Sequence, residues 1–220
     1  ALPGVHFLLA ERPNEFATAA ERLRSDSGFR ATLIVAARRL AREAADTAVK
    51  LNGNLAQAQA ALATTHFFYE WDLSTARSLY ELALRLDGRY SHAHHYLALL
   101  LAVDGKFQEA RERIDEAIQL DRSAVLLSAR ARIFYFSEQF SEAREGYQEA
   151  LQVGPNHIPA LLGLGLSSLM DGDAEAAMNA YDRADERLGG QGLVVFALKG
   201  HLLGGLGRTE EARAILQGME

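Results

Sequence analysis

Small and large apolar residues recur along most of the chain with a period close to 34 residues. Five alanines mark this period, at intervals of 34, 33, 34 and 35 residues. A large apolar or aromatic residue follows each of them by four positions, and another alanine follows the first four by seven. Since positions i, i+4 and i+7 share one face of an α-helix, each stretch predicts a helix with a buried stripe. The anchor alanines are Ala76, Ala110, Ala143, Ala177 and Ala212.

A partner helix is predicted upstream of each anchor. A small residue stands twelve positions before every anchor, where two helices can approach closely only if the side chain is small. Turn signals separate the helices: "LDGRY", "LDRSA" and "VGPNH" lie between repeats, and "VDGKF", "MDGDA" and "GLGRT" lie inside them. The small positions are Thr64, Ala98, Ala131, Gly165 and Gly200.

This pattern resembles the tetratricopeptide repeat (TPR), in which two antiparallel helices fill about 34 residues. The resemblance implies an all-α fold, a right-handed solenoid of antiparallel helix pairs. An N-terminal helical region is predicted at 1–56, with a degenerate repeat or one long helix at 29–51. Five TPR-like units are predicted at about 57–90, 91–123, 124–157, 158–192 and 193–220.

A narrower resemblance covers residues 67–122, which are similar to the repeat arrays of bacterial winged-helix transcription regulators and class III nucleotidyl cyclases. Those arrays carry an aromatic-Asp-Trp-Asp-Trp motif, an Ala-Glu pair, "LxPxY" and Ala-His-His. This chain keeps Ala93-His94-His95, but has "EWDL" at 70–73, Ala76-Arg77 and Gly88 at the other places. The resemblance implies the regulatory domain of a transcription regulator. The alternatives are a cyclase array, a free-standing scaffold in secretion or pilus assembly, and an enzyme subunit that holds a catalytic partner.

The first helix of each repeat lines the concave groove in such solenoids. The inward positions here are aromatic and aliphatic with little charge, so we expect an apolar or amphipathic peptide or helix of a protein partner to bind. The chain's own N-terminal helix is an alternative occupant, and the aromatics could instead only fill a tight superhelix. A homo-oligomer is a separate partner hypothesis. The predicted groove residues are Phe68, Tyr69, His92, His95, Tyr96, Leu99, Arg132, Tyr135, Phe136, Leu162, Leu166 and His201.

The Lys/Asn/Lys/Arg clamp of repeats that bind chaperone C-termini is not expected in this groove. The corresponding positions hold Ala61, Thr65, Tyr96, Val125 and Ala129.

The histidines of "SHAHHY" suggest a metal site, but the repeat assigns them other roles. His94 takes the bulky packing position that Leu127 and Leu161 occupy in later repeats. His92 and His95 share the inner face of their helix, and no acidic residue lies within one turn there to complete a ligand set. We therefore expect no metal.

Composition narrows the classes of function further. The net charge of −6 gives no global field for nucleic acid or anionic membranes, and the absence of cysteine excludes disulfides and thiol chemistry. The longest nearly apolar run, 13 residues from Ile158 to Met170, is shorter than the roughly 20 that a membrane span needs. "GLGLSS" at 163–168 lacks the final glycine of a dinucleotide loop. We expect no enzyme, cofactor or direct nucleic-acid binding, and a cytoplasmic location, or a periplasmic one if an upstream membrane helix tethers the chain.

Overall fold

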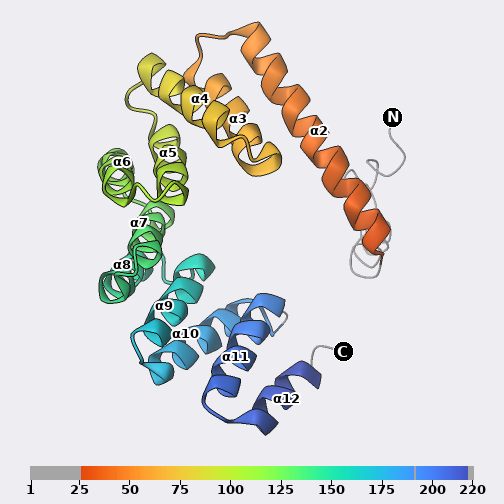
Figure 1. Ribbon diagram of the computed structural model, residues 1–220, viewed down its shortest axis with the longest axis vertical. Helices are drawn as coiled ribbons and strands as arrows, with labels where there is room; N and C mark the ends of the chain where they lie inside the picture. Colours follow the sequence, from red (N-terminus) through yellow and green to blue (C-terminus); the bar gives the residue numbers. More distant parts are fainter. Residues whose placement is uncertain (1–25, 191, 218–220) are drawn as a thin grey trace. The chain divides into compact units, whose positions relative to one another are not determined.

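The computed structural model describes residues 26–190 and 192–217, and every regular element in these ranges is a helix (Figure 1). This confirms the predicted all-α class with consecutive helix pairs. The part of the predicted N-terminal region before residue 26 lies outside the described residues. The helices are α2 (Ser27–Leu51), α3 (Ala56–Thr65), the π-helix η2 (His66–Glu70), α4 (Leu73–Leu86), α5 (Ser91–Val103), α6 (Phe107–Leu120), α7 (Ala124–Phe136), α8 (Phe140–Val153), α9 (Ile158–Met170), α10 (Ala174–Arg187), α11 (Leu193–Gly205) and α12 (Thr209–Gln217).

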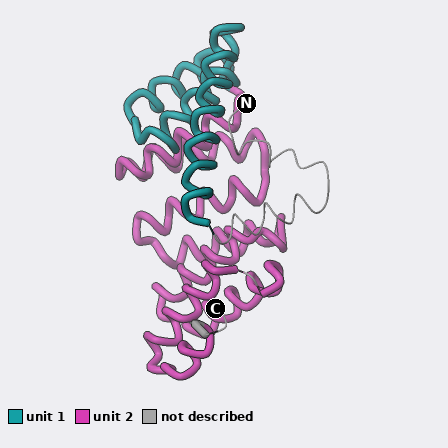
Figure 2. Tube along the Cα trace, turned by 90° about the vertical axis from the view of Figure 1, so that its right-hand side faces the viewer, with its two compact units in different colours: residues 1–88 teal, residues 89–220 magenta. Residues whose placement is uncertain are grey.

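The chain divides into two compact units, residues 1–88 and residues 89–220 (Figure 2). In the first unit, α2 is one unbroken helix over 29–51, the range for which the sequence predicted either a degenerate repeat or one long helix. Its N-terminus is capped by the Asp26 carboxylate, which accepts a hydrogen bond of 2.9 Å from the backbone N–H of Phe29. α2 packs against α3, and α3 packs against α4.

The second unit consists of the pairs α5/α6, α7/α8, α9/α10 and α11/α12 (Figure 1). Each of these pairs lies inside one predicted repeat range, although the repeat boundaries themselves stay a prediction. α7 packs directly against both α5 and α9, so the first helices of three successive pairs lie side by side. The anchor positions Ala110, Ala143 and Ala177 are fully buried, as expected for slots where helices touch, whereas Ala212 is only partly buried.

Aromatic rings of the second helices pack onto glycines of α9. A Cβ added at Gly163 would lie 2.2 Å from Cζ of Tyr147, and one at Gly165 would lie 2.2 Å from Cε1 of Tyr181. Since no real Cβ comes that close to a ring atom, the two tyrosines fill the space that the glycines leave. The same packing places the ring of Tyr147, a residue of α8, beside the first helix α9.

The turns inside the pairs use a left-handed residue at equivalent places. Gly105, Gly172 and Gly207 adopt φ values of 75°, 84° and 73° there. Glu138 takes the equivalent place between α7 and α8 with φ 60°, although this conformation favours glycine.

Candidate functional site

The last residue of each of three adjacent first helices is a large apolar side chain that remains half exposed. Val103 ends α5, Phe136 ends α7 and Met170 ends α9, with exposed fractions of 56%, 50% and 54%. They stand 33 and 34 residues apart, so they occupy the same repeat position. We call these three residues the apolar row. The prediction of groove residues included Phe136 but missed Val103, which the 33-residue spacing could have identified.

The predicted groove residues of α5 form one aromatic cluster. The ring centroid of Tyr96 lies 4.5 Å from that of His92 and 4.6 Å from that of His95. His92 is exposed and Leu99 is half-buried, but His95 is only 8% exposed. His95 is therefore not an open groove residue, because the neighbouring helix α7 covers the side of α5 on which it lies.

The predicted residues of α7 differ in role. Arg132 and Phe136 are exposed, whereas Tyr135 is half-buried and packs against the hydrophobic core of the second unit. Its ring centroid lies 5.6 Å from that of Phe140 at the start of α8. Tyr135 therefore contributes to the packing between α7 and α8.

The remaining predicted groove residues are not brought into this cluster. Leu162 packs against the core, Leu166 is half-buried on α9, and His201 is exposed on α11. Phe68 and Tyr69 belong to η2 of the first unit, where their exposed fractions are 44% and 40%. They form a separate exposed aromatic pair in that unit.

A cavity of about 200 Å³ lies within the second unit, between α5, α7, α8 and the start of α9. Its polar lining consists of His95, Ser128, Arg132, Tyr147 and His157. Only Arg132 among them carries a permanent charge. We call this space the Arg132 cavity.

Burial sets the protonation of the groups around the Arg132 cavity. The pKa of His95 is lowered to about 4, first by burial and then by the positive charges of Arg132 and His92. Burial also lowers the pKa of His157 and raises the pKa of the Tyr147 phenol to about 12. Near pH 7 the two imidazoles are therefore neutral and the phenol keeps its proton.

His94 is buried, as its packing position predicts, but it also has a polar partner that the sequence did not suggest. Its Nδ1 lies 3.0 Å from Oε2 of Glu116 on α6. This pair does not make a metal site by itself, and the described residues contain no cluster of three or more His, Asp or Glu side chains placed to hold a metal ion.

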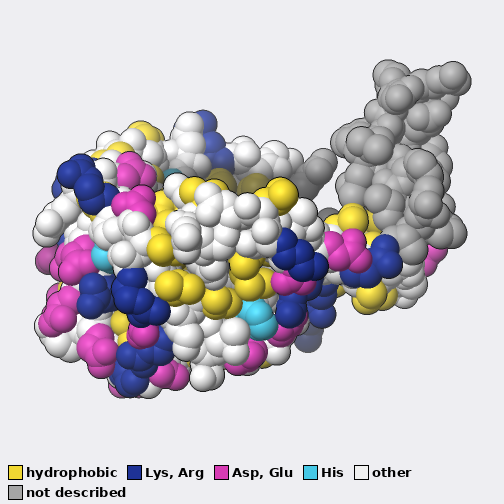
Figure 3. Space-filling view, turned by 90° about the horizontal axis from the view of Figure 1, so that it is seen from above, with side chains coloured by type: hydrophobic (Ala, Val, Ile, Leu, Met, Phe, Trp, Pro, Cys, Tyr) yellow, Lys and Arg dark blue, Asp and Glu magenta, His cyan; other side chains and the backbone are white. Residues whose placement is uncertain are grey.

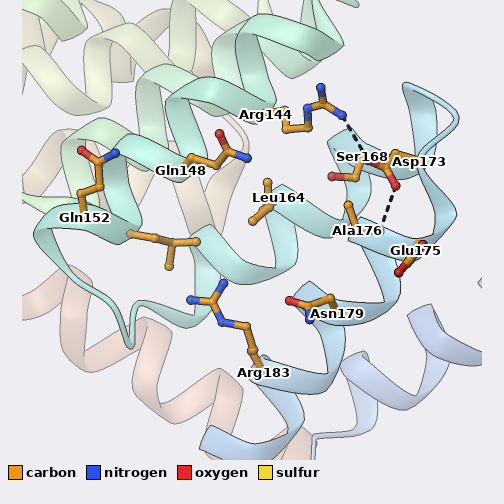
Figure 4. Close-up of a pocket in the computed structure, with 11 residues that line it drawn as sticks. Arg144, Gln148, Gln152, Leu164, Ser168, Asp173, Glu175, Ala176, Asn179 and Arg183 are labelled. Atoms are coloured by element: carbon orange, nitrogen blue, oxygen red, sulfur yellow. Dashed lines mark hydrogen bonds and ion pairs between the residues drawn. The ribbon is translucent and has the colours of Figure 1, made fainter.

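A second, larger hollow of about 770 Å³ lies between α8 and α10, with α9 as its floor (Figure 4). Sequence reasoning missed it, although the polar residues Arg144, Gln148 and Gln152 at intervals of four mark one face of α8. Nη1 of Arg144 lies 3.3 Å from Oδ2 of Asp171 and 3.5 Å from Oδ2 of Asp173, so its charge is neutralised. We call this hollow the α8/α10 cleft.

On the face that Figure 3 draws, Lys and Arg side chains alternate with Asp and Glu, and hydrophobic side chains are exposed between them. Within the described residues, no helix combines the length and the apolar character that crossing a membrane requires.

Comparison with known proteins gives a curated relative and several similar solved structures. No protein-family model matches the chain. Human Tetratricopeptide repeat protein 13 is 31% identical over 87 residues, which are 40% of this chain and 10% of that protein. The chain thus spans about a tenth of the curated relative that it matches.

Similar solved structures cover most of the chain. PilW, described as a type IV pilus biogenesis factor, has a TM-score of 0.74 at 17% identity over 92% of this chain and 90% of that chain. Pseudomonas aeruginosa pilF has a TM-score of 0.68 at 21% identity, with 84% of each chain covered. YrrB, described as a TPR protein with an unusual peptide-binding site, has a TM-score of 0.55 at 19% identity, covering 79% of this chain and 89% of that one.

At these identities the structural likeness shows the fold alone. The repeat register of the sequence, the helix pairs and the matching segment of a human TPR protein nevertheless agree with one another. Together they show that the chain has the helix-pair fold of these solved structures, and that a segment of it is similar to a tetratricopeptide repeat protein.

Proposed function

We propose that the second unit binds an apolar or amphipathic helix of a partner protein along the apolar row. The observation that carries this proposal is the repetition of a half-exposed Val103, Phe136 and Met170 at one position of three adjacent helices. An amphipathic helix presents apolar side chains along one stripe, and exposed apolar side chains at one position of neighbouring helices are suited to receive it. Tyr96 and Leu99, half-buried on α5, extend the apolar character of this surface.

The second helices offer a check on this argument. Val153, the last residue of α8, is also apolar and 46% exposed, so an exposed apolar helix end is by itself only a feature of the repeat. What favours the first helices is that α7 packs against both α5 and α9, which places the ends of these helices on neighbouring elements.

The test compares two valines that both end a helix. Binders are selected from a library of helical peptides on the wild-type protein, and their affinities are measured by fluorescence anisotropy for wild type, Val103→Asp and Val153→Asp. A charge placed in the binding surface should weaken binding by about tenfold or more. The Val153→Asp variant should bind like wild type. Val153 also ends a helix, but this helix is α8, a second helix, which does not contribute to the apolar row. Equal affinities for both variants would reject the apolar row as the binding site.

The larger protein in which this module acts is a separate part of the proposal. The resemblance of residues 67–122 favours the regulatory domain of a bacterial transcription regulator. A free-standing scaffold is the alternative, and the similarity in fold to PilW, described as a type IV pilus biogenesis factor, makes pilus assembly its most specific form. Sequencing of the full gene tests this, since an upstream winged-helix domain supports the regulator and a lipoprotein signal supports the scaffold.

A further inference from the structure

The Arg132 cavity keeps buried polar atoms that have no partner within the described residues. His95 is 8% exposed and Ser128 is 6% exposed, and both line the cavity. Neither Nε2 of His95 nor Oγ of Ser128 has a hydrogen-bond partner among the residues that the structure describes. A buried polar group without a partner destabilises a protein by about 1–3 kcal/mol, so two of them at one small cavity call for an explanation.

The cavity also holds a cation that no carboxylate of the described residues balances. Arg132 lines it, and the lining contains no Asp or Glu. Arg130, two positions earlier on α7, behaves differently, because it pairs with Asp115 of α6 and with Glu149 of α8. The contrast between two arginines of one helix shows that carboxylates lie within reach of this region, yet no carboxylate of the described residues neutralises Arg132 in the cavity.

The polar groups of the cavity are mainly hydrogen-bond donors. The guanidinium of Arg132 donates only, the phenol of Tyr147 and the hydroxyl of Ser128 can donate, and a neutral His95 can carry its proton on Nε2. Donors that line one small cavity together with a single guanidinium suit a planar carboxylate, which arginine binds through two parallel hydrogen bonds. A single negative charge matches the cavity, because both histidines are neutral near pH 7 and Arg132 alone is charged.

Size and composition agree with such a ligand. A volume of about 200 Å³ is almost seven times the roughly 30 Å³ that a water molecule occupies in the liquid, enough for a small organic acid or a glutamate side chain. The arrangement differs from the clamp of chaperone-binding repeats, because the two clamp positions in this cavity are Val125 and Ala129, which have no polar side-chain atoms.

We propose that the Arg132 cavity binds one carboxylate group, with Arg132 as its counter-ion and Ser128, Tyr147 and His95 as hydrogen-bond donors. The carboxylate belongs either to a free small organic acid or to an acidic side chain of a peptide that docks on the apolar row. Only the peptide source rests on the function proposed above.

The test uses carboxylate probes alone, so that it does not depend on a partner. Sodium acetate and N-acetyl-glutamic acid amide are titrated into the protein at pH 7 and constant ionic strength, with the resonances of His95 and Ser128 followed by NMR. Acetamide and N-acetyl-glutamine amide are the neutral controls. We expect saturable shifts with the two carboxylates and none with the two amides. Tighter binding of acetate indicates a free acid as the source, and tighter binding of the glutamyl probe indicates a peptide side chain.

Variants assign the effect to the cavity. Arg132→Gln should weaken the binding of both carboxylates at least tenfold, and since Arg132 is exposed, its thermal melt should stay close to that of wild type. Arg183→Gln is the matched control, because Arg183 lines the α8/α10 cleft and has no acidic partner within the described residues. Carboxylate shifts that equal those of the amides, or that survive in Arg132→Gln, would overturn the proposal. Loss of peptide binding in Val103→Asp with acetate binding intact would separate the two functions.

Discussion

The Arg132 cavity and the α8/α10 cleft are both hollows of the second unit, and they differ in the charged side chains that line them. The cleft is almost four times larger, about 770 Å³ against about 200 Å³, yet the cation Arg144 at its edge is already held by Asp171 and Asp173. The lining of the smaller cavity contains no carboxylate, whereas Asp173 and Glu175 line the cleft. Two buried polar atoms without partners among the described residues belong to the cavity, Nε2 of His95 and Oγ of Ser128, and one belongs to the cleft, Oγ of Ser168. The balance of acidic and basic side chains in the lining, rather than volume, therefore decides which hollow suits an anion.

The largest expected effect is a change of stability with pH, because histidines line the Arg132 cavity and not the α8/α10 cleft. The pKa of His95 is about 4 in the folded protein and about 6.5 in an unfolded chain, so between these values the unfolded state binds more protons. Stability should therefore fall as the pH drops from about 6.5 to 4, by about 3 kcal/mol from this residue.

Urea unfolding at a series of pH values measures this loss. The other titratable groups that line the cavity or act on His95 are His92, Arg132, Tyr147 and His157. Of these, His92 and His157 also take up protons as the pH falls. His95→Gln should flatten the dependence between pH 6.5 and 4, whereas Arg183→Gln in the cleft should keep the wild-type slope. An unchanged slope in His95→Gln would show that His95 is not held neutral by its surroundings.

The next effect separates two glycines that pack against tyrosines in the same way. Gly163→Ala would place a Cβ 2.2 Å from the Tyr147 ring, and Gly165→Ala would place one 2.2 Å from the Tyr181 ring. Each should destabilise the fold by about 1–3 kcal/mol through overpacking. Because Tyr147 lines the Arg132 cavity, only Gly163→Ala should also weaken acetate binding. Chemical unfolding and the acetate titration measure the two effects, and equal loss of acetate in Gly165→Ala would contradict the role assigned to Tyr147.

The smallest effect concerns two buried serines. Ser128 lines the cavity and Ser168 lines the cleft, and the hydroxyl of each is buried without a partner among the described residues. Removing an unsatisfied buried hydroxyl should stabilise the protein by about 1 kcal/mol, so both Ser128→Ala and Ser168→Ala should raise the melting temperature. Only Ser128→Ala should lower the affinity for acetate, by about threefold. If neither variant is more stable than wild type, the two hydroxyls have partners in solution, and Ser128 loses its place in the argument for a site.

The sequence by itself determined the class of fold. The 34-residue register identified the buried slots Ala110, Ala143 and Ala177 and the turns at Gly105 and Gly172, because interhelix distance and left-handed backbone conformation each restrict the residue type at a given position. It also placed Phe136 and Arg132 on the exposed side of the first helices. These features depend on one helix pair at a time, and a periodic pattern describes such local requirements well.

Only the tertiary structure decided which side chains meet. His95 and Arg132 are 37 residues apart and share a cavity because α5 and α7 pack side by side, and Tyr147 reaches the same cavity across Gly163. The periodic pattern gives the face of each helix but not the size of the space between faces. That space depends on the side chains of three repeats together. For example, α7 has the small Ala129 at the repeat position where α5 has the larger Tyr96. Charge neutralisation is decided in the same way, because the carboxylates that bind Arg130 and Arg144 come from neighbouring helices and turns rather than from nearby positions in the sequence.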